Sequence, residues 1–147
     1  MLANLETLLL LETLYLSLNK IKDINISTTL SGLTHLELEC NEINSLQGLK
    51  SFPNLEHLVL EENHIIDVSF LSSLKNLGYL RLGFNPIEDI TSLHSLKKIH
   101  LLHINHCSIR MPPDLTQFPY LRSFISDFDG LHPNTLRKSN QFTCRLK

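Results

Sequence analysis

Two histidines and two glutamates of this chain stand at a spacing that could bind a metal ion. His35 and His57 are 22 residues apart, and Glu37 and Glu39 follow the first of them at alternate positions. Imidazole and carboxylate groups bind zinc when they converge on one point. A metal site also needs partners that fix its ligands, and this spacing implies none. We therefore predict no metal and no cofactor. Because we find no Ser/His/Asp or Cys/His arrangement and no glycine-rich phosphate loop, we expect the chain not to be an enzyme.

Charge and cysteine usage argue against several other functions. The 147 residues carry a formal net charge of -2, with a pI near 6.4, whereas direct binding to nucleic acid or to an anionic membrane needs a basic surface. Cys40, Cys107 and Cys144 are too few and too scattered for a disulfide framework or a zinc site. An odd number of thiols favours a reducing compartment, and we recognise no signal peptide or membrane span. We expect an intracellular protein, either cytoplasmic or nuclear.

The spacing of the histidines belongs to a pattern that fills the chain. The unit L-x-x-L-x-L-x-x-N-x-I recurs every 22 residues, and a period of roughly 20–29 residues with this pattern is typical of leucine-rich repeats. Its copies begin at Leu11, Leu33, Leu55, Leu77, Ile99 and Leu121, and the last two diverge from the consensus. Such repeats stack into solenoids, which mostly bind other molecules.

Each unit predicts one short strand and one crossover. The leucines of Leu-x-Leu point to one face and the residue between them to the other, as in a β-strand. Between units, apolar residues recur at every third position, for example at Leu46, Leu49, Phe52 and Leu55. This stripe is typical of a 3₁₀-like or short α turn with one buried edge. The predicted fold is an α/β leucine-rich-repeat solenoid, with a curved parallel β-sheet on the concave side and the turns on the convex side.

A column of amide side chains follows the predicted strands. Where the chain turns inward, backbone groups lose their ladder partners, and a buried asparagine offers them donors and an acceptor. We interpret the column as a structural ladder without a catalytic role. Its members are Asn19, Asn41, Asn63, Asn85 and, as a weaker hydrogen-bonding substitute, Cys107.

The extended unit N-x-I-x-x-[IVL]-x-x-L-x-x-L-x-x-L-x-x-L-x-L resembles the 22-residue subclass named after a regulatory subunit of protein phosphatase type 1, over residues 2–131. Segments 117–122 and 128–130 are similar to the C-terminal cap of that subclass, with residues 124–127 as an apparent insertion. Relatives in this group include an axonemal dynein light chain, the A-prime protein of the spliceosomal U2 particle and tubulin-folding cofactors, all intracellular binding proteins. Bacterial internalins share the 22-residue period and bind host receptors. The resemblance implies a binding module and does not identify the partner.

The pattern divides the chain into a repeat domain and a tail. We assign residues 1–131 to the leucine-rich-repeat domain, including a half repeat at 1–10, and residues 132–147 to a C-terminal cap or tail. The half repeat has crossover leucines and no strand. We therefore expect either that the sequence is a piece of a longer protein or a shortened isoform, or that the half repeat acts as a lid.

Function is expected on the exposed, concave face of the sheet, because the leucines are needed for packing. Four carboxylates (Glu37, Glu39, Glu61 and Glu62) fall on adjacent strands that are about 5 Å apart. They are either a solvated acidic surface or a landing site for a basic patch. Aromatic residues near this charge have the composition of an interface; they are Tyr15, Tyr79, Phe84 and Phe128. We predict a protein partner with a basic surface, which contacts Glu37, Glu39, Glu61, Tyr79, Arg81, Phe84 and His103.

The resemblance implies a regulatory or scaffolding subunit, because the phosphatase regulator grips its enzyme with acidic and aromatic residues of this face. Two alternatives remain open. One is a structural subunit of a cytoskeletal, axonemal or ribonucleoprotein assembly. The other is a secreted, internalin-like adhesin, against which the unpaired cysteines argue. The oligomeric state is not predicted.

Overall fold

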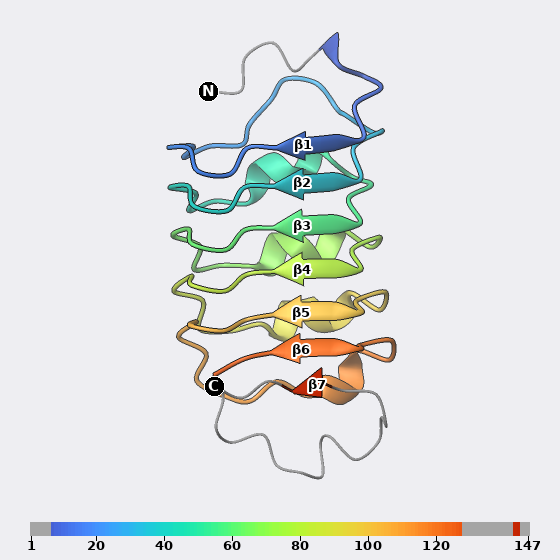
Figure 1. Ribbon diagram of the computed structural model, residues 1–147. Helices are drawn as coiled ribbons and strands as arrows, with labels where there is room; N and C mark the ends of the chain where they lie inside the picture. The colour runs from blue at the N-terminus through green and yellow to red at the C-terminus, as the bar shows by residue number, and fades with distance from the viewer. Residues whose placement is uncertain (1–6, 128–142, 145–147) are drawn as a thin grey trace.

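Seven short strands form one parallel sheet in the order of the sequence (Figure 1). The computed structural model describes residues 7–127 and 143–144. Neighbouring strands pair one repeat apart, so that Leu36 lies opposite Leu58 and Leu58 opposite Leu80. The parallel sheet expected from the Leu-x-Leu units is confirmed. Its strands are β1 (Thr13–Tyr15), β2 (His35–Glu37), β3 (His57–Val59), β4 (Tyr79–Arg81), β5 (Leu101–His103), β6 (Ser123–Ile125) and β7 (Thr143–Cys144).

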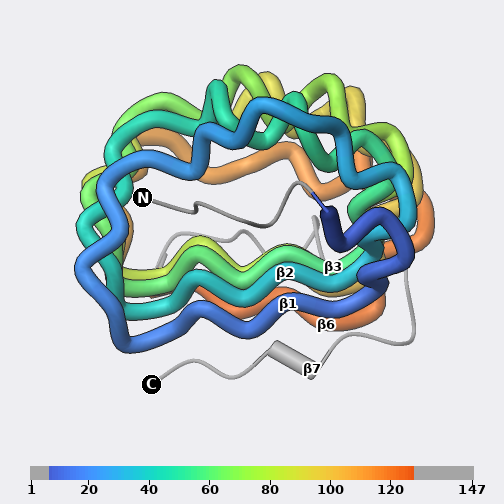
Figure 2. The backbone as a smooth tube through the Cα atoms, turned by 90° about the horizontal axis from the view of Figure 1, so that it is seen from above, coloured from blue at the N-terminus to red at the C-terminus, as the bar shows by residue number. Residues whose placement is uncertain are grey.

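Short 3₁₀ turns lie across the coil from the strands, as the view along the solenoid shows (Figure 2). They are η2 (Gln47–Ser51), η3 (Ser69–Ser73), η4 (Thr91–Ser95) and η5 (Leu115–Gln117). The three-residue stripe forms their buried edge: Leu46, Leu49 and Phe52 around η2 are at most 3% exposed. The predicted solenoid of strands and short turns is therefore confirmed. Within the described part of the chain, no helix is long and apolar enough to cross a bilayer.

The core is a continuous column of leucine and isoleucine between the sheet and the turns. In the third repeat, Leu55, Leu58, Leu60 and Ile65 are fully buried, and each such side chain contributes about 1.5–3 kcal/mol on burial. The neighbouring repeats supply that burial. In the first repeat, where β1 forms an edge of the sheet, Leu14 is only half-buried.

Buried asparagines connect consecutive repeats after each strand. The Asn63 amide nitrogen Nδ2 donates to the carbonyl of Leu38 at 2.9 Å and to that of Leu60 at 3.1 Å, and Oδ1 accepts from the Ile43 amide at 2.9 Å. Asn41 and Asn85 make the corresponding bonds. These side chains therefore bond to both their own repeat and the preceding one.

The two end members of the ladder, Asn19 and Cys107, form fewer hydrogen bonds than the asparagines between them. Asn19 is exposed, and among the described residues it donates only within its own repeat, to the carbonyls of Leu16 and Ser17. The Cys107 thiol donates to the carbonyl of Leu82 at a sulfur–oxygen distance of 3.5 Å. A thiol is a weak donor and a weak acceptor, so this last rung is weaker than an amide.

Two regions depart from a regular array. The crossover between Ile21 and Leu33 contains no 3₁₀ turn, and Ser27 occupies a stripe position that is apolar in later repeats. Strand β7 pairs in parallel with β6, although it comes from the segment expected to be a cap or tail. An unpaired strand edge favours such pairing. Residues 1–6 of the predicted half repeat, residues 128–131 of the sixth repeat (with Phe128), and residues 132–142 and 145–147 of the predicted tail lie outside the described residues.

Candidate functional site

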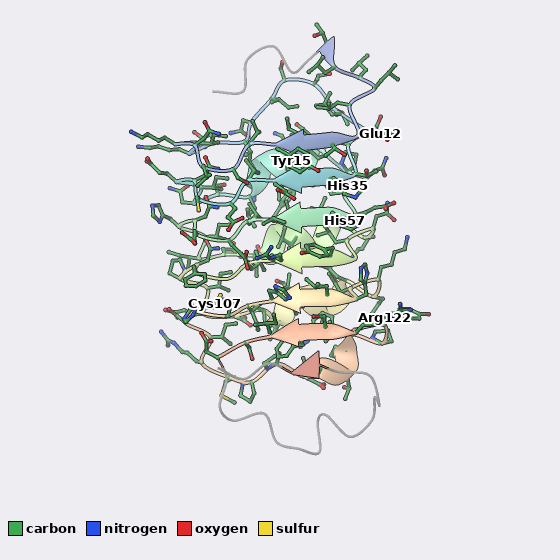
Figure 3. All side chains as sticks on the ribbon, viewed as in Figure 1. Glu12, Tyr15, His35, His57, Cys107 and Arg122 are labelled. Carbon is green, nitrogen blue, oxygen red and sulfur yellow. The ribbon has the colours of Figure 1, made fainter. Side chains whose placement is uncertain are left out.

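The outward side chains of β1–β6 and of the strand exits form one surface, called the strand face below. Figure 3 shows Tyr15, His35 and His57 on neighbouring strands of it. Two adjoining hollows on this face, sharing Glu39 and Arg81, are lined by all of the predicted contact residues. The histidine cavity, of about 120 Å³, is lined by Tyr15, His35, Glu37, Glu39, His57, Tyr79 and Arg81 among others. The Phe84 cavity, of about 360 Å³, is lined by Glu39, Glu61, Glu62, Arg81, Phe84, His103, Asn105, His106, Ile125 and Asp127.

Three stacked rings form one wall of the histidine cavity. The ring centroids of His35 and His57 are 4.1 Å apart, and those of His57 and Tyr79 are 5.2 Å apart, with interplanar angles below 20°. The stack arises because parallel register places these residues opposite one another on β2, β3 and β4. Burial, with a smaller effect from His35, lowers the pKa of His57 below its ordinary value. The neutral form of His57 is therefore favoured in the folded chain.

One predicted contact residue is less accessible than the sequence suggests. Glu61 is only 5% exposed, and its carboxylate forms an ion pair with Arg81 of the next strand. Burial raises the pKa of Glu61, and the charge of Arg81 partly opposes this rise. Glu61 therefore differs from the other carboxylates of the predicted acidic surface, because it is buried. Glu61 neutralises and orients Arg81, whereas Glu37 and Glu39 form no ion pair with any described residue.

The Phe84 cavity combines an aromatic wall with several carboxylates. Phe84 is 47% exposed, and its ring centroid lies 4.3 Å from that of His106. Asp127 is engaged by the same histidine, whose Nδ1 is 3.0 Å from the carboxylate. His103 also lines the cavity, and its Nε2 atom is buried without a hydrogen-bond partner among the described residues. Burial lowers the pKa of His103, so its neutral form is favoured at neutral pH.

The structure groups potential metal ligands differently from the spacing argument. Among the described residues, the grouping with suitable geometry is Glu39, Cys40 and Glu62, whose ligand atoms lie within 4.8 Å of one another. Neither His35 nor His57 belongs to it. Burial and the adjacent Glu62 raise the pKa of the Cys40 thiol, which donates to the Glu62 carboxylate at 3.4 Å. A protonated thiol is a poor metal ligand.

Several residues of the two cavities were not among the predicted contacts. They include Tyr15, Glu62, Asn105, His106 and Asp127. All of them occupy outward or strand-exit positions of the 22-residue register, so the sequence did carry a positional signal. Their selection depends on which side chains lean towards each other across neighbouring repeats, and the repeat pattern does not encode that.

Comparisons with known proteins support the repeat assignment. Two family descriptions match the chain, "Leucine rich repeat" over residues 10–65 and "Leucine Rich repeats (2 copies)" over residues 53–95. No curated protein matches the sequence. Internalin C2 of Listeria monocytogenes has a similar structure, with a TM-score of 0.72 and 27% identity, over 93% of this chain and 71% of that one.

Two further solved structures are similar in fold. The functional domain of InlJ from Listeria monocytogenes superposes with a TM-score of 0.74 at 19% identity, over 92% of this chain and 30% of its own length. A leucine-rich-repeat protein of Leptospira interrogans superposes with a TM-score of 0.74 at 24% identity, over 93% of this chain and 37% of its own length. The chain thus spans about a third of these two structures. Together with the parallel sheet and the 3₁₀ turns, these matches establish that the chain is a leucine-rich-repeat solenoid.

Proposed function

We propose that this solenoid is a non-catalytic protein-binding module whose strand face docks a partner with a basic surface. The observation that carries the proposal is the convergence of the predicted contact residues on two adjoining cavities of one face. Leucine-rich-repeat domains generally bind proteins, and the exposed side chains here have the composition of an interface: carboxylates beside Tyr15 and Phe84, which are 68% and 47% exposed.

The unpaired carboxylates favour a basic partner. Glu37 and Glu39 follow one another on the outward side of β2 and its exit, and neither meets a cation among the described residues. Like charges on the same strand face repel, so a cationic group of a partner gains attraction and relieves that repulsion. The cation that this surface does contain, Arg81, is already paired with Glu61.

A charge-reversal experiment tests the proposal. The variant Glu37→Lys/Glu39→Lys is expected to lose a partner that the wild type captures from a native lysate, as measured by mass spectrometry. The matched control is Glu12→Lys/Glu56→Lys, because those exposed glutamates change the net charge equally and line neither cavity. Glu61 is left unchanged, since a lysine there would be buried beside Arg81. If both variants capture the same proteins as wild type, the strand face is not the interface.

We further propose a regulatory or scaffolding role inside the cell. Cys40 and Cys107 are both free thiols in the structure, which suits a reducing compartment. The alternative of a secreted, internalin-like adhesin is favoured by the 27% identity with internalin C2. Microscopy of the tagged protein in its native cells separates the two: retention inside the cell supports the first, and recovery from the medium or the cell surface supports the second.

A further inference from the structure

Beside Phe84 and Asn105 of the Phe84 cavity lies a glycine that its backbone geometry does not require. Position 83 is the only outward position of its column on β1–β6 that carries no side chain; its counterparts are Ser17, Glu39, Glu61, Asn105 and Asp127. Gly83 does not adopt a positive φ, so its backbone does not require glycine. A Cβ atom there would lie 2.8 Å from Oδ1 of Asn105. Glycine therefore leaves room for the Asn105 amide to lie along the sheet as part of the cavity wall.

Some of the charged groups around this cavity form ion pairs and others do not. Arg81 and Glu61 pair with each other, and Asp127 is engaged by His106. Glu39 and Glu62 remain: their closest ligand oxygens lie within 4.8 Å of each other, and no cation lies within ion-pair distance of either among the described residues. Two carboxylates at this separation repel. The lining of the cavity therefore combines an excess of negative charge with the half-exposed Phe84 ring.

We propose that the Phe84 cavity receives a guanidinium group, presented by an arginine side chain of the protein partner. The plane of the guanidinium stacks on the Phe84 ring, and its N–H groups donate to Glu39 and Glu62. The side-chain oxygen Oδ1 of Asn105 offers a further acceptor. This inference rests on the proposed function, since it specifies which group of a basic partner enters the strand face.

A guanidinium suits these walls better than an ammonium group does. It is planar and weakly hydrated, so it stacks on an aromatic face at low desolvation cost. Its five N–H donors lie in one plane and can reach acceptors on more than one strand, whereas an ammonium concentrates its charge at a single point. The acceptors of the cavity are spread over the exits of β2, β3 and β5.

The test uses small probes that carry only the side chain in question. Nα-acetyl-arginine methylamide is titrated into the full ¹⁵N-labelled chain, and amide shifts are followed by NMR. We expect saturable shifts of Gly83, Phe84 and Asn105 with a millimolar Kd, as for a ligand of few atoms. The neutral isostere Nα-acetyl-citrulline methylamide is expected to bind about tenfold or more weakly, because charge-assisted bonds are lost, and the lysine analogue at least about threefold more weakly.

Two variants that keep the fold locate the site. Phe84→Leu removes the aromatic face and Glu62→Gln removes one charge, and each should weaken arginine-amide binding about threefold or more. Glu12→Gln, outside both cavities, should leave it unchanged. Circular dichroism checks that each variant is folded. Absence of saturable binding to the wild type, equal binding of the citrulline probe, or insensitivity to both cavity variants would overturn the inference. Equal binding of the lysine probe would overturn the choice of guanidinium.

The same variants distinguish this inference from the proposed function. If partner capture is lost in Glu37→Lys/Glu39→Lys and kept in Phe84→Leu and Glu62→Gln, the strand face binds the partner but the Phe84 cavity does not take its arginine. If capture is lost in all three, both proposals are supported. If capture survives in all three while the arginine probe binds, the cavity is a cation site and the proposed interface is wrong.

Discussion

Replacing Asn63 with alanine tests whether buried amides hold the repeats together. Asn63 is 4% exposed and connects three segments of backbone. Its Nδ2 donates to the carbonyls of Leu38, Leu60 and Glu61 at 2.9–3.1 Å, and its Oδ1 accepts from the amide of Ile43 at 2.9 Å. Alanine removes all four bonds and leaves a small void at the strand exit.

The size of the effect follows from which groups lose their last partner. Ile43 is fully buried, and its amide has Asn63 as its partner; leaving it unpaired costs about 1–3 kcal/mol. The three carbonyls keep another donor each: Asn41 for Leu38, Asn85 for Leu60 and the Cys40 amide for Glu61. Their weakened bonding adds about 0.5–1.5 kcal/mol. We expect Asn63→Ala to lower the free energy of unfolding by about 2–4 kcal/mol.

The chain supplies matched controls at the two ends of the ladder. Asn19 is exposed and bonds within its own repeat, so Asn19→Ala should cost less than about 1 kcal/mol. In the fourth repeat, the Ile87 amide bonds to the carbonyl of Asn85 at 2.8 Å instead of to a side chain of the fifth repeat, where Cys107 occupies the ladder position. Cys107→Asn restores that acceptor and should stabilise the fold by about 0.5–1.5 kcal/mol.

Urea unfolding followed by far-UV circular dichroism measures all three changes, since the chain has no Trp to serve as a fluorescent probe. The slope of the free energy of unfolding against urea should stay constant while the midpoint moves. If Asn63→Ala falls within about 0.5 kcal/mol of wild type, or if Asn19→Ala costs as much, the ladder does not hold the repeats together as argued.

Two further predictions concern packing and pH. Gly48→Ala should destabilise the fold by about 1–3 kcal/mol, because the new Cβ would lie 2.6–2.8 Å from backbone and side-chain atoms of Ile24. In Gly83→Ala the new Cβ would meet only the end of a side chain. Its free energy of unfolding, measured with urea, should stay within about 0.5 kcal/mol of the wild-type value. The pKa of His57 is lowered from 6.5 by burial and then by His35, so the folded chain binds fewer protons there than the unfolded chain. The free energy of unfolding should therefore fall as pH drops from 6.5 through the lowered pKa of His57. His57→Gln should make the urea midpoint depend less steeply on pH between about pH 7.5 and 5. If the variant and the wild type show the same pH dependence, His57 is not the group responsible.

The repeat pattern predicted the positions of strands, turns and amide rungs because one physical requirement recurs in every unit. Each Leu-x-Leu must bury two side chains against the neighbouring repeats, so register follows directly from the 22-residue spacing. Side-chain pairing across strands has no such periodicity. The sequence placed Glu61 on the outward face, but its burial depends on the arginine at position 81 of the next strand. Likewise, the ring stack depends on three particular residues of different repeats, and β7 belongs to no repeat.

The strand exits show where the repeat geometry ends and the choice of side chain begins. Leu18, Cys40, Glu62, Phe84 and His106 each adopt φ between 53° and 61°, a left-handed conformation that costs a residue with a Cβ about 1–2 kcal/mol. Because the conformation recurs in every described exit, it belongs to the turn that precedes the amide rung. Glycine or asparagine would adopt this left-handed conformation at the lowest energetic cost, and none of these positions carries either residue. Nothing in the structure explains Leu18, which is 82% exposed. Glu62 and Phe84, by contrast, line one cavity from adjacent exits, and the arginine site proposed above would give a reason for keeping these side chains despite the backbone cost.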